Sequence, residues 1–80
     1  MKRYFFDVSD GWHDPDRVGT ELADDQAARR EAIRFASDIL RHEPHRLEEA
    51  RMRIDVHDLE RTVEFVIEIR MQTLGAFQAD

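Results

Sequence analysis

The acidic segment between residues 7 and 16 is the first part of this chain whose side chains could do chemistry. Its titratable residues are Asp7, Asp10, His13, Asp14 and Asp16. Calcium takes about six to eight oxygen ligands at defined spacing. In an EF-hand reading that starts at Asp7, Gly11 comes one position too early and Val18 stands where the bidentate glutamate belongs. We therefore expect solvated turn residues here, with a metal site in segment 7–16 as the minor alternative.

A second candidate metal site lies near the middle of the chain. His42 and His45 are three residues apart, a spacing at which two side chains of one helix can share a metal ion. Pro44 lies between them and ends that helix, so the two side chains are not expected to converge. A third ligand would have to come from Glu48 or Glu49, because the chain has no cysteine. The sequence therefore predicts no metal and no cofactor.

Catalysis by a nucleophile needs a hydroxyl or thiol beside a base. No hydroxyl residue lies in a glycine-rich or nucleophile-elbow context; the candidates are Ser9, Thr20, Ser37, Thr62 and Thr73. Three glycines in the whole chain leave no phosphate-binding loop. We expect a protein that is not an enzyme.

Arginines raise the alternative of RNA binding. They cluster on one flank of the predicted helix and on the open face of the predicted sheet: Arg29, Arg30, Arg34, Arg41, Arg51, Arg53 and Arg70. Base stacking needs exposed aromatic side chains, and only Phe5 and Trp12 qualify. The net charge of −6 and the pI of about 5.1 repel nucleic acid. RNA binding through Arg30 and Arg34 is therefore a minor alternative.

Contact with another protein requires the fewest assumptions. Phe5 and Val66 fall on a sheet face otherwise filled with charged residues, and Trp12 falls in a loop, where its burial needs a partner or a fold-back of the chain. The last strand offers a long edge, which invites pairing with another chain. We predict a homodimer whose contact surface includes Phe5, Trp12, Val66 and this edge. The alternative is that Trp12 caps the core and Phe5 is a lone exposed residue.

The hydrophobic pattern defines the elements that must position these residues. Apolar residues alternate over residues 3–9 and 18–22, recur at helical spacing from residue 24, and alternate again over 51–57 and 62–72. This predicts an α+β fold of β-β-α-β-β order, in which one helix packs on one face of a four-stranded, mainly antiparallel sheet. The strand order cannot be read from the pattern. His57 alternates onto the open face, where we expect it to be exposed.

The helix has clear limits, whereas the last strand does not. Asp24 is a good N-cap and Pro44 ends the helix, with one further helical turn expected over residues 44–50. The inward stripe of the helix is Ala28, Ala32, Phe35, Ala36 and Ile39. The last strand is long for so small a domain, so its far end is expected to project beyond its neighbours. We expect one domain over residues 1–72 and a flexible tail over residues 73–80.

Composition narrows the class of protein. The 80 residues are 41% hydrophobic and 38% charged, which suits one small domain with a thin core. Without cysteine there are no disulfides, and self-association becomes the simplest further source of stability. No apolar run approaches the roughly 20 residues of a membrane span, and the apolar run at the N-terminus is too short for a signal peptide. We therefore expect a cytoplasmic protein.

Three segments resemble a known family. They are RYFFDVSDG over residues 3–11, GTELAD over 19–24 and AARREA over 27–32. Together they are similar to a family of short alpha-proteobacterial proteins of unknown function, which open with a Tyr-Phe-Phe strand and an Asp-Gly turn. The resemblance covers residues 3–41, while the second hairpin matches only in pattern, since residues 58–61 replace the family's Asp-Gly-type turn. It implies a bacterial source and these domain limits, and it carries no activity, ligand or functional residue.

The sequence thus favours a non-catalytic protein-interaction or homodimerising module. One alternative is an acidic regulator or inhibitor of antitoxin or anti-defence type that binds a basic protein partner. The other is the RNA-binding module.

Overall fold

The computed structural model describes residues 1–48 and 51–75 of the chain. In chain order it has the strands β1 (Lys2–Ser9), β2 (His13–Asp14) and β3 (Thr20–Leu22), the helices α1 (Asp25–His42) and α2 (His45–Glu48), and the strands β4 (Met52–Asp58) and β5 (Glu64–Ile69). The predicted α+β class and β-β-α-β-β order are confirmed. Of the second predicted strand, residues 18–22, only the part that forms β3 is a strand, and β2 was not predicted. Helix α2 is the expected further helical turn.

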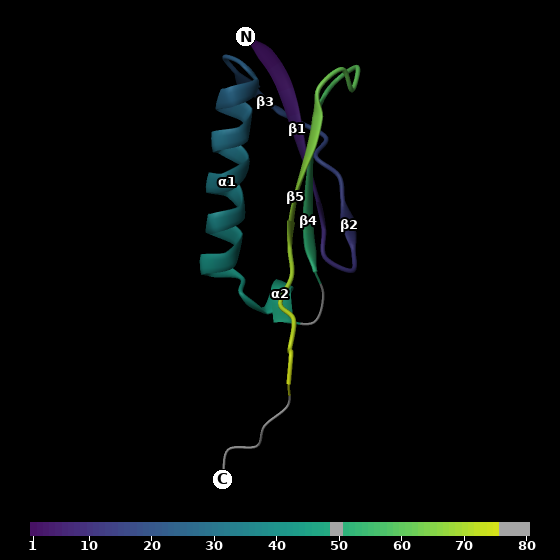
Figure 1. Cartoon of the computed structure of the whole chain (residues 1–80). Coiled ribbons are helices and arrows are strands. Elements are labelled where there is room, and N and C mark those ends of the chain that lie inside the picture. Colours follow the sequence, from purple (N-terminus) through teal and green to yellow (C-terminus); the bar gives the residue numbers. More distant parts are fainter. Residues whose placement is uncertain (49–50, 76–80) are drawn as a thin grey trace.

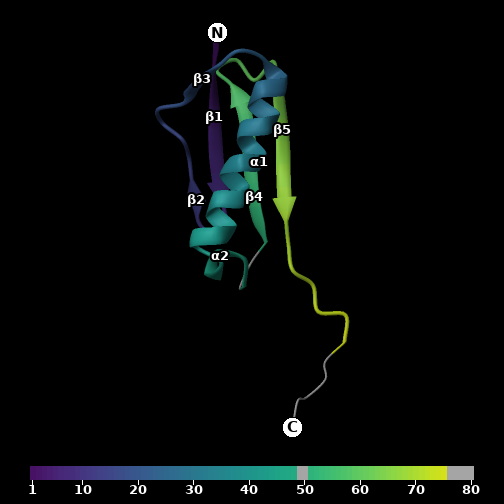
Figure 2. The same cartoon turned by 90° about the vertical axis from the view of Figure 1, so that its left-hand side faces the viewer.

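The described strands form one antiparallel sheet in the order β2-β1-β4-β5, and β3 pairs with another part of β1. β1 and β4 are therefore central, and β5 is an edge strand (Figure 2). Tyr4 lies opposite Asp58 and Ser9 opposite Arg53. The two halves of the chain thus meet at the centre of the sheet.

Helix α1 covers one face of this sheet (Figure 1). Its N-cap is Asp24, as predicted, and the carboxylate of Asp24 accepts a hydrogen bond from the N–H of Ala27 at 2.8 Å. Ala28, Ala32 and Ala36 lie one turn apart and are buried. Because alanine side chains are small, the helix can pack closely against the central strands.

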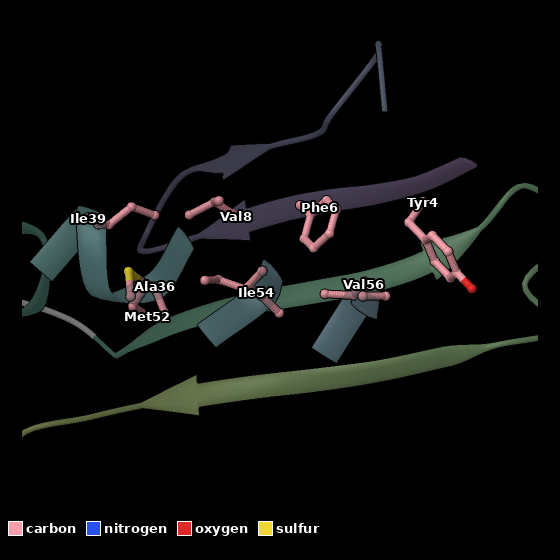
Figure 3. Close-up of a cluster of buried hydrophobic side chains, with 10 residues drawn as sticks. Tyr4, Phe6, Val8, Ala36, Ile39, Met52, Ile54 and Val56 are labelled. Carbon is pink, nitrogen blue, oxygen red and sulfur yellow. The ribbon is translucent and has the colours of Figure 1, made fainter. Parts of the chain in front are cut away.

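The core lies between α1 and the two central strands (Figure 3). The side chains that alternate inward from β1 and β4 are fully or almost fully buried: Tyr4, Phe6, Val8, Met52, Ile54 and Val56. Phe35 of the predicted helix stripe is only half-buried and meets Phe6 edge to face, with ring centroids 6.2 Å apart. The inward faces predicted for both central strands are confirmed.

The last strand is shorter than predicted, because β5 covers residues 64–69 and not 62–72. At its start, the turn after β4 takes up residues 59–63, with Arg61 in the left-handed region at φ 56°. At its end, Ile69 lies opposite Met52, the first residue of β4, so no partner strand remains for the following residues. The expected projection beyond the neighbouring strands is therefore wrong, and Met71 is 64% exposed.

The segment before β3 also differs from the prediction. Val18 and Gly19 do not join the strand, because their N–H groups bond to the carboxylate of Asp16. Of the predicted tail, residues 73–75 have no regular secondary structure, and residues 76–80 lie outside the described residues. None of the helices in the described part of the chain is long and apolar enough to cross a membrane.

Candidate interaction surface

The sheet face opposite α1 carries three cross-strand rows of side chains. The rows are Ser9, Arg53 and Glu68; Asp7, Asp55 and Val66; and Phe5, His57 and Glu64. Side chains directly opposite each other in neighbouring strands are close enough to interact. Phe5 and Val66 therefore share this face, as predicted, but they lie in different rows with β4 between their strands.

His57 is not the exposed strand residue that the alternation suggested. Its side chain is 12% exposed, and its Nε2 atom lies 3.0 Å from the Asp7 carboxylate. Its Nδ1 atom lies 2.9 Å from the carbonyl oxygen of Asp58. Burial favours the neutral ring, but these two hydrogen bonds outweigh it and raise the pKa of His57. Both partners are hydrogen-bond acceptors, so this site favours the protonated ring, in which both nitrogens donate.

Phe5 is half-buried on this ring. The rings of Phe5 and His57 are stacked with centroids 5.5 Å apart. On its other side Phe5 meets Gly19, where an added Cβ would come within 3.0 Å of the Phe5 ring and 2.7 Å of the Arg3 side chain. Gly19 has φ 78°, so both space and backbone favour glycine there. Phe5 is therefore mainly a packing residue.

Asp16 organises the acidic segment through backbone hydrogen bonds. Its carboxylate accepts the N–H groups of Phe6 at 3.1 Å, Val18 at 3.0 Å and Gly19 at 2.9 Å. Burial alone would raise the pKa of Asp16, but these three bonds lower it. The N–H of Asp16 in turn donates to the carboxylate of Asp7 at 2.8 Å. These carboxylates hold the loop in place.

The metal candidates are dispersed. Among residues 1–48 and 51–75, no group of three or more histidine, aspartate or glutamate side chains is arranged to hold a metal ion. The Nδ1 atom of His42 lies 2.9 Å from the carbonyl oxygen of Asp38, one turn earlier in α1. Glu49, one of the suggested further ligands, lies outside the described residues.

Trp12 lies at the tip of the β1–β2 hairpin and is 85% exposed. It borders a hollow next to α2 that is also lined by Asp10, His45 and Arg46. Asp10 and Arg46 form an ion pair, and the hydrogen bond from Arg46 lowers the pKa of Asp10. Because the hairpin tip is beyond the row that contains Ser9, Trp12 does not form one patch with Val66.

Three of the seven arginines considered for RNA binding are engaged in ion pairs within the described residues: Arg34, Arg51 and Arg53. The guanidinium of Arg34 bonds to Glu31 and to Asp38, the latter at 2.7 Å. Arg51 and Arg53 both approach Glu68, at 3.7 Å and 3.8 Å. Both arginines thus contact a carboxylate of the neighbouring strand β5. Arg30 is exposed on α1.

A hollow of about 580 Å³ lies between α1 and the segment around residues 14–17. Phe6 and Phe35 contribute apolar surface, and Glu31 and Arg34 contribute charge. These charged groups already bond to each other. The hollow therefore presents apolar surface beside an ion pair.

The outer edge of β5 carries unpaired backbone groups. The N–H of Asp58 donates to the carbonyl of Val63 at 3.2 Å, which marks these two residues as a hydrogen-bonded pair. Hydrogen-bonded pairs alternate along an antiparallel ladder, so Phe65, Ile67 and Ile69 direct their backbone groups toward β4. The even-numbered residues Glu64, Val66 and Glu68 direct theirs away from the sheet, where no strand of the described chain lies.

The helix-covered side of β5 is incompletely covered. Phe65, Ile67 and Ile69 are only half-buried, because α1 lies mainly over the central strands (Figure 2). Arg29 stacks over the Phe65 ring at 4.7 Å, and Ile33, one turn further along α1, is 61% exposed. Ile33, Phe65, Ile67 and Ile69 form an apolar strip along the free edge, which we name the β5 strip. Val66, on the other face, is 38% exposed.

Sequence reasoning found the edge and Val66 but missed the β5 strip. The signal was available, since Ile33 is a large apolar residue next to the predicted inward stripe of the helix. A family model described as a domain of unknown function, DUF6894, matches residues 3–70. This range contains nearly all of the sheet, both helices and the second hairpin. Comparison with curated proteins and with solved structures found no match.

Proposed function

We propose that this chain, which belongs to the DUF6894 family of domains of unknown function, is a non-catalytic interaction module that pairs with a second copy of itself along β5. One observation carries this proposal. The backbone groups of Glu64, Val66 and Glu68 point out of the sheet beside the half-covered β5 strip. A strand added there would satisfy the backbone groups and bury apolar surface at the same time.

The size of the fold supports the same conclusion. A single core in a chain of this length supplies only about 3–5 kcal/mol, so small folds commonly gain stability by association. The chain has no cysteine for disulfides. Pairing along β5 would add buried area where the core is thinnest. We extend the proposal to a cytoplasmic, bacterial protein, as the composition and the resemblance suggest.

The alternative functions have weaker support. An acidic regulator would need free carboxylates in segment 7–16, but Asp10 is bonded to Arg46 and Asp16 to three backbone N–H groups. An RNA-binding module would need a cluster of free arginines beside exposed aromatic side chains, but Arg34 is held by two acidic residues of its own helix, and Phe5 is half-buried. An enzyme would need ionisable groups that converge in a hollow, and in the hollow beside α1 Glu31 and Arg34 already bond to each other.

Replacing the outward N–H of Val66 tests the proposal. Proline at this position removes a hydrogen-bond donor from the free edge and leaves the bonds between β4 and β5 intact. We expect the wild type to have twice the 9.5 kDa mass of one chain, and Val66→Pro to have the mass of a monomer with an unchanged circular dichroism spectrum. Light scattering at micromolar concentration measures the mass.

Val66→Thr is the matched control. It keeps the N–H and a β-branched side chain, so it should remain dimeric. A monomeric wild type, or a Val66→Pro variant that is folded and still dimeric, would rule out pairing along this edge.

A further inference from the structure

We propose that the two copies pair antiparallel about a twofold axis at Ile67, so that Glu64 of each copy lies opposite Arg70 of the partner subunit. This inference rests on the proposed self-pairing along β5. It adds the register of the interface and the residues that select it.

The alternation of side chains limits the possible registers. The β5 strip must continue on the helix-covered side of the joined sheet, and Val66 must remain on the other side. Because a slip of one residue turns every side chain to the opposite face, odd-numbered residues must lie opposite odd-numbered residues. In an antiparallel pair of identical strands, the twofold axis then passes through one residue of β5.

Charge excludes two of these registers. An axis at Val66 would place Glu64 opposite Glu68 of the partner subunit, twice in the dimer. An axis at Glu68 would place that residue opposite its own copy. Like charges directly opposite each other destabilise a strand pair. The two glutamates of β5 thus exclude both registers.

The length of β5 excludes two more. An axis at Phe65 would pair only residues 64–66 of the two copies, because residues 59–63 form the turn after β4. With an axis at Ile69, the two strands would overlap only at Ile69 itself, because β5 ends at this residue. The axis at Ile67 pairs residues 65–69 of both copies, all of which belong to the strand.

The remaining register is favourable on both faces. On the open face Glu64 lies opposite Arg70 of the partner subunit, the residue that directly follows β5, which makes two pairs of opposite charge in the dimer. Val66 lies opposite Glu68 of the partner subunit, and Arg51 and Arg53 balance the charge of Glu68 within each chain. Arg70 is exposed and forms no ion pair with any residue in the described ranges. On the covered face Ile67 meets its own copy and Phe65 meets Ile69 of the partner subunit. The β5 strips of the two copies thus become continuous.

The geometry of this register can be tested by cross-linking. Ile67 directs its backbone groups toward β4, so its pair across the axis is not hydrogen-bonded, and the two Cα atoms would lie about 4.5 Å apart. That distance is within the range that a disulfide can span. Since the chain has no cysteine, one engineered cysteine reports one position without interference.

We expect Ile67→Cys to form a covalent dimer under mild oxidation, nearly completely and faster than any neighbouring variant. Val66→Cys and Ile69→Cys serve as matched controls, because each would cross-link to its own copy if the twofold axis passed through that residue. If wild type is dimeric but cross-linking occurs at residue 66 or 69 and not at 67, the proposed register is wrong. Self-pairing along β5 would then still hold. A monomeric wild type would overturn both proposals.

Charge reversal provides a second test that needs no oxidation. Glu64→Arg and Arg70→Glu should each raise the dimer dissociation constant about tenfold, because each places like charges opposite each other. The double variant should regain the wild-type constant. An equal mixture of the two single variants should form a heterodimer, since opposite charges then meet at both positions.

Glu64 also bonds to Arg61 of its own chain at 2.7 Å, so the loss of that pair must be separated from the loss of the interface. Arg61→Gln is the control and should leave the dissociation constant unchanged. If the double variant and the mixture dimerise as weakly as the single variants, the proposed pairing of Glu64 with Arg70 is wrong.

Discussion

The ring of His57 connects the two central strands on the open face. The folded state favours the protonated ring, because the carbonyl of Asp58 and the carboxylate of Asp7 both accept hydrogen bonds from it. A histidine whose pKa is higher in the folded chain than in the unfolded chain stabilises the fold at low pH. Its contribution is complete below the unfolded pKa of about 6.5 and is lost as the pH rises through the folded pKa.

We therefore expect wild type to be more stable than His57→Gln by about 1–3 kcal/mol near pH 6, from hydrogen bonds to a charged group. The difference should shrink as the pH rises through the raised pKa of the folded state, where the ring loses its proton. Urea unfolding at several pH values measures the difference. Glutamine keeps a hydrogen-bond donor but cannot become a cation. The part of the stability difference that depends on pH therefore measures the effect of the His57 charge.

Other charged groups around this ring make a matched comparison necessary. Asp7, Asp55 and Arg61 all act on His57, and burial together with Glu64 raises the pKa of Asp55. Asp7→Asn should remove most of the pH dependence while keeping the packing. An NMR titration in which the His57 ring loses its proton below its ordinary pKa would contradict the assignment.

At the scale of elements, the segment between β2 and β3 is held to β1 by one carboxylate. Asp16 accepts N–H groups both from its own turn and from Phe6 of β1. Removing this carboxylate leaves three backbone donors without their partner.

We expect Asp16→Ala to lower the free energy of unfolding by about 1–3 kcal/mol, since unsatisfied donors cost more than the net gain of a bond. Hydrogen exchange at Phe6, Val18 and Gly19 should accelerate. Asp14→Ala, an exposed position in the same segment, is the matched control and should have little effect. Equal effects of the two variants would show that the loop is held by other contacts.

The elements that sequence predicts well are those whose pattern is local. Alternation gave the inward faces of β1 and β4, and Asp24 and Pro44 gave the limits of α1, because side-chain direction and capping depend on nearby residues. The ends of β5 depend instead on the length of β4 and on the turn between them. Those ends were therefore placed too far apart.

The candidate surface shows the same division. The position of Val66 on the open face follows from alternation, but the contact that holds His57 is with Asp7, which is 50 residues away in sequence. Asp10 and Arg46 are 36 residues apart. No period or spacing predicts such pairs, since they depend on the strand order. The order places β1 next to β4, and this neighbourhood creates the contact between Asp7 and His57.

At the scale of the whole molecule, α1 is too narrow to cover a sheet of this width. It buries the central strands and leaves the β5 strip half-covered (Figure 2). If two copies complete each other there, part of the stability of each fold resides in the dimer. Stability then depends on protein concentration, because dissociation and unfolding are linked by mass action.

We expect the Tm of wild type to rise with protein concentration. Each tenfold increase contributes about 0.7 kcal/mol per protomer, half of the 1.4 kcal/mol per tenfold for the dimer, which corresponds to about 3–5 °C for a domain of this size. Val66→Pro should show no such dependence, and Val66→Thr should follow wild type. Calorimetry over a hundredfold range of concentration measures this. A constant Tm for wild type would mean that α1 and the sheet are stable without a partner, and that the half-covered β5 strip costs the monomer little.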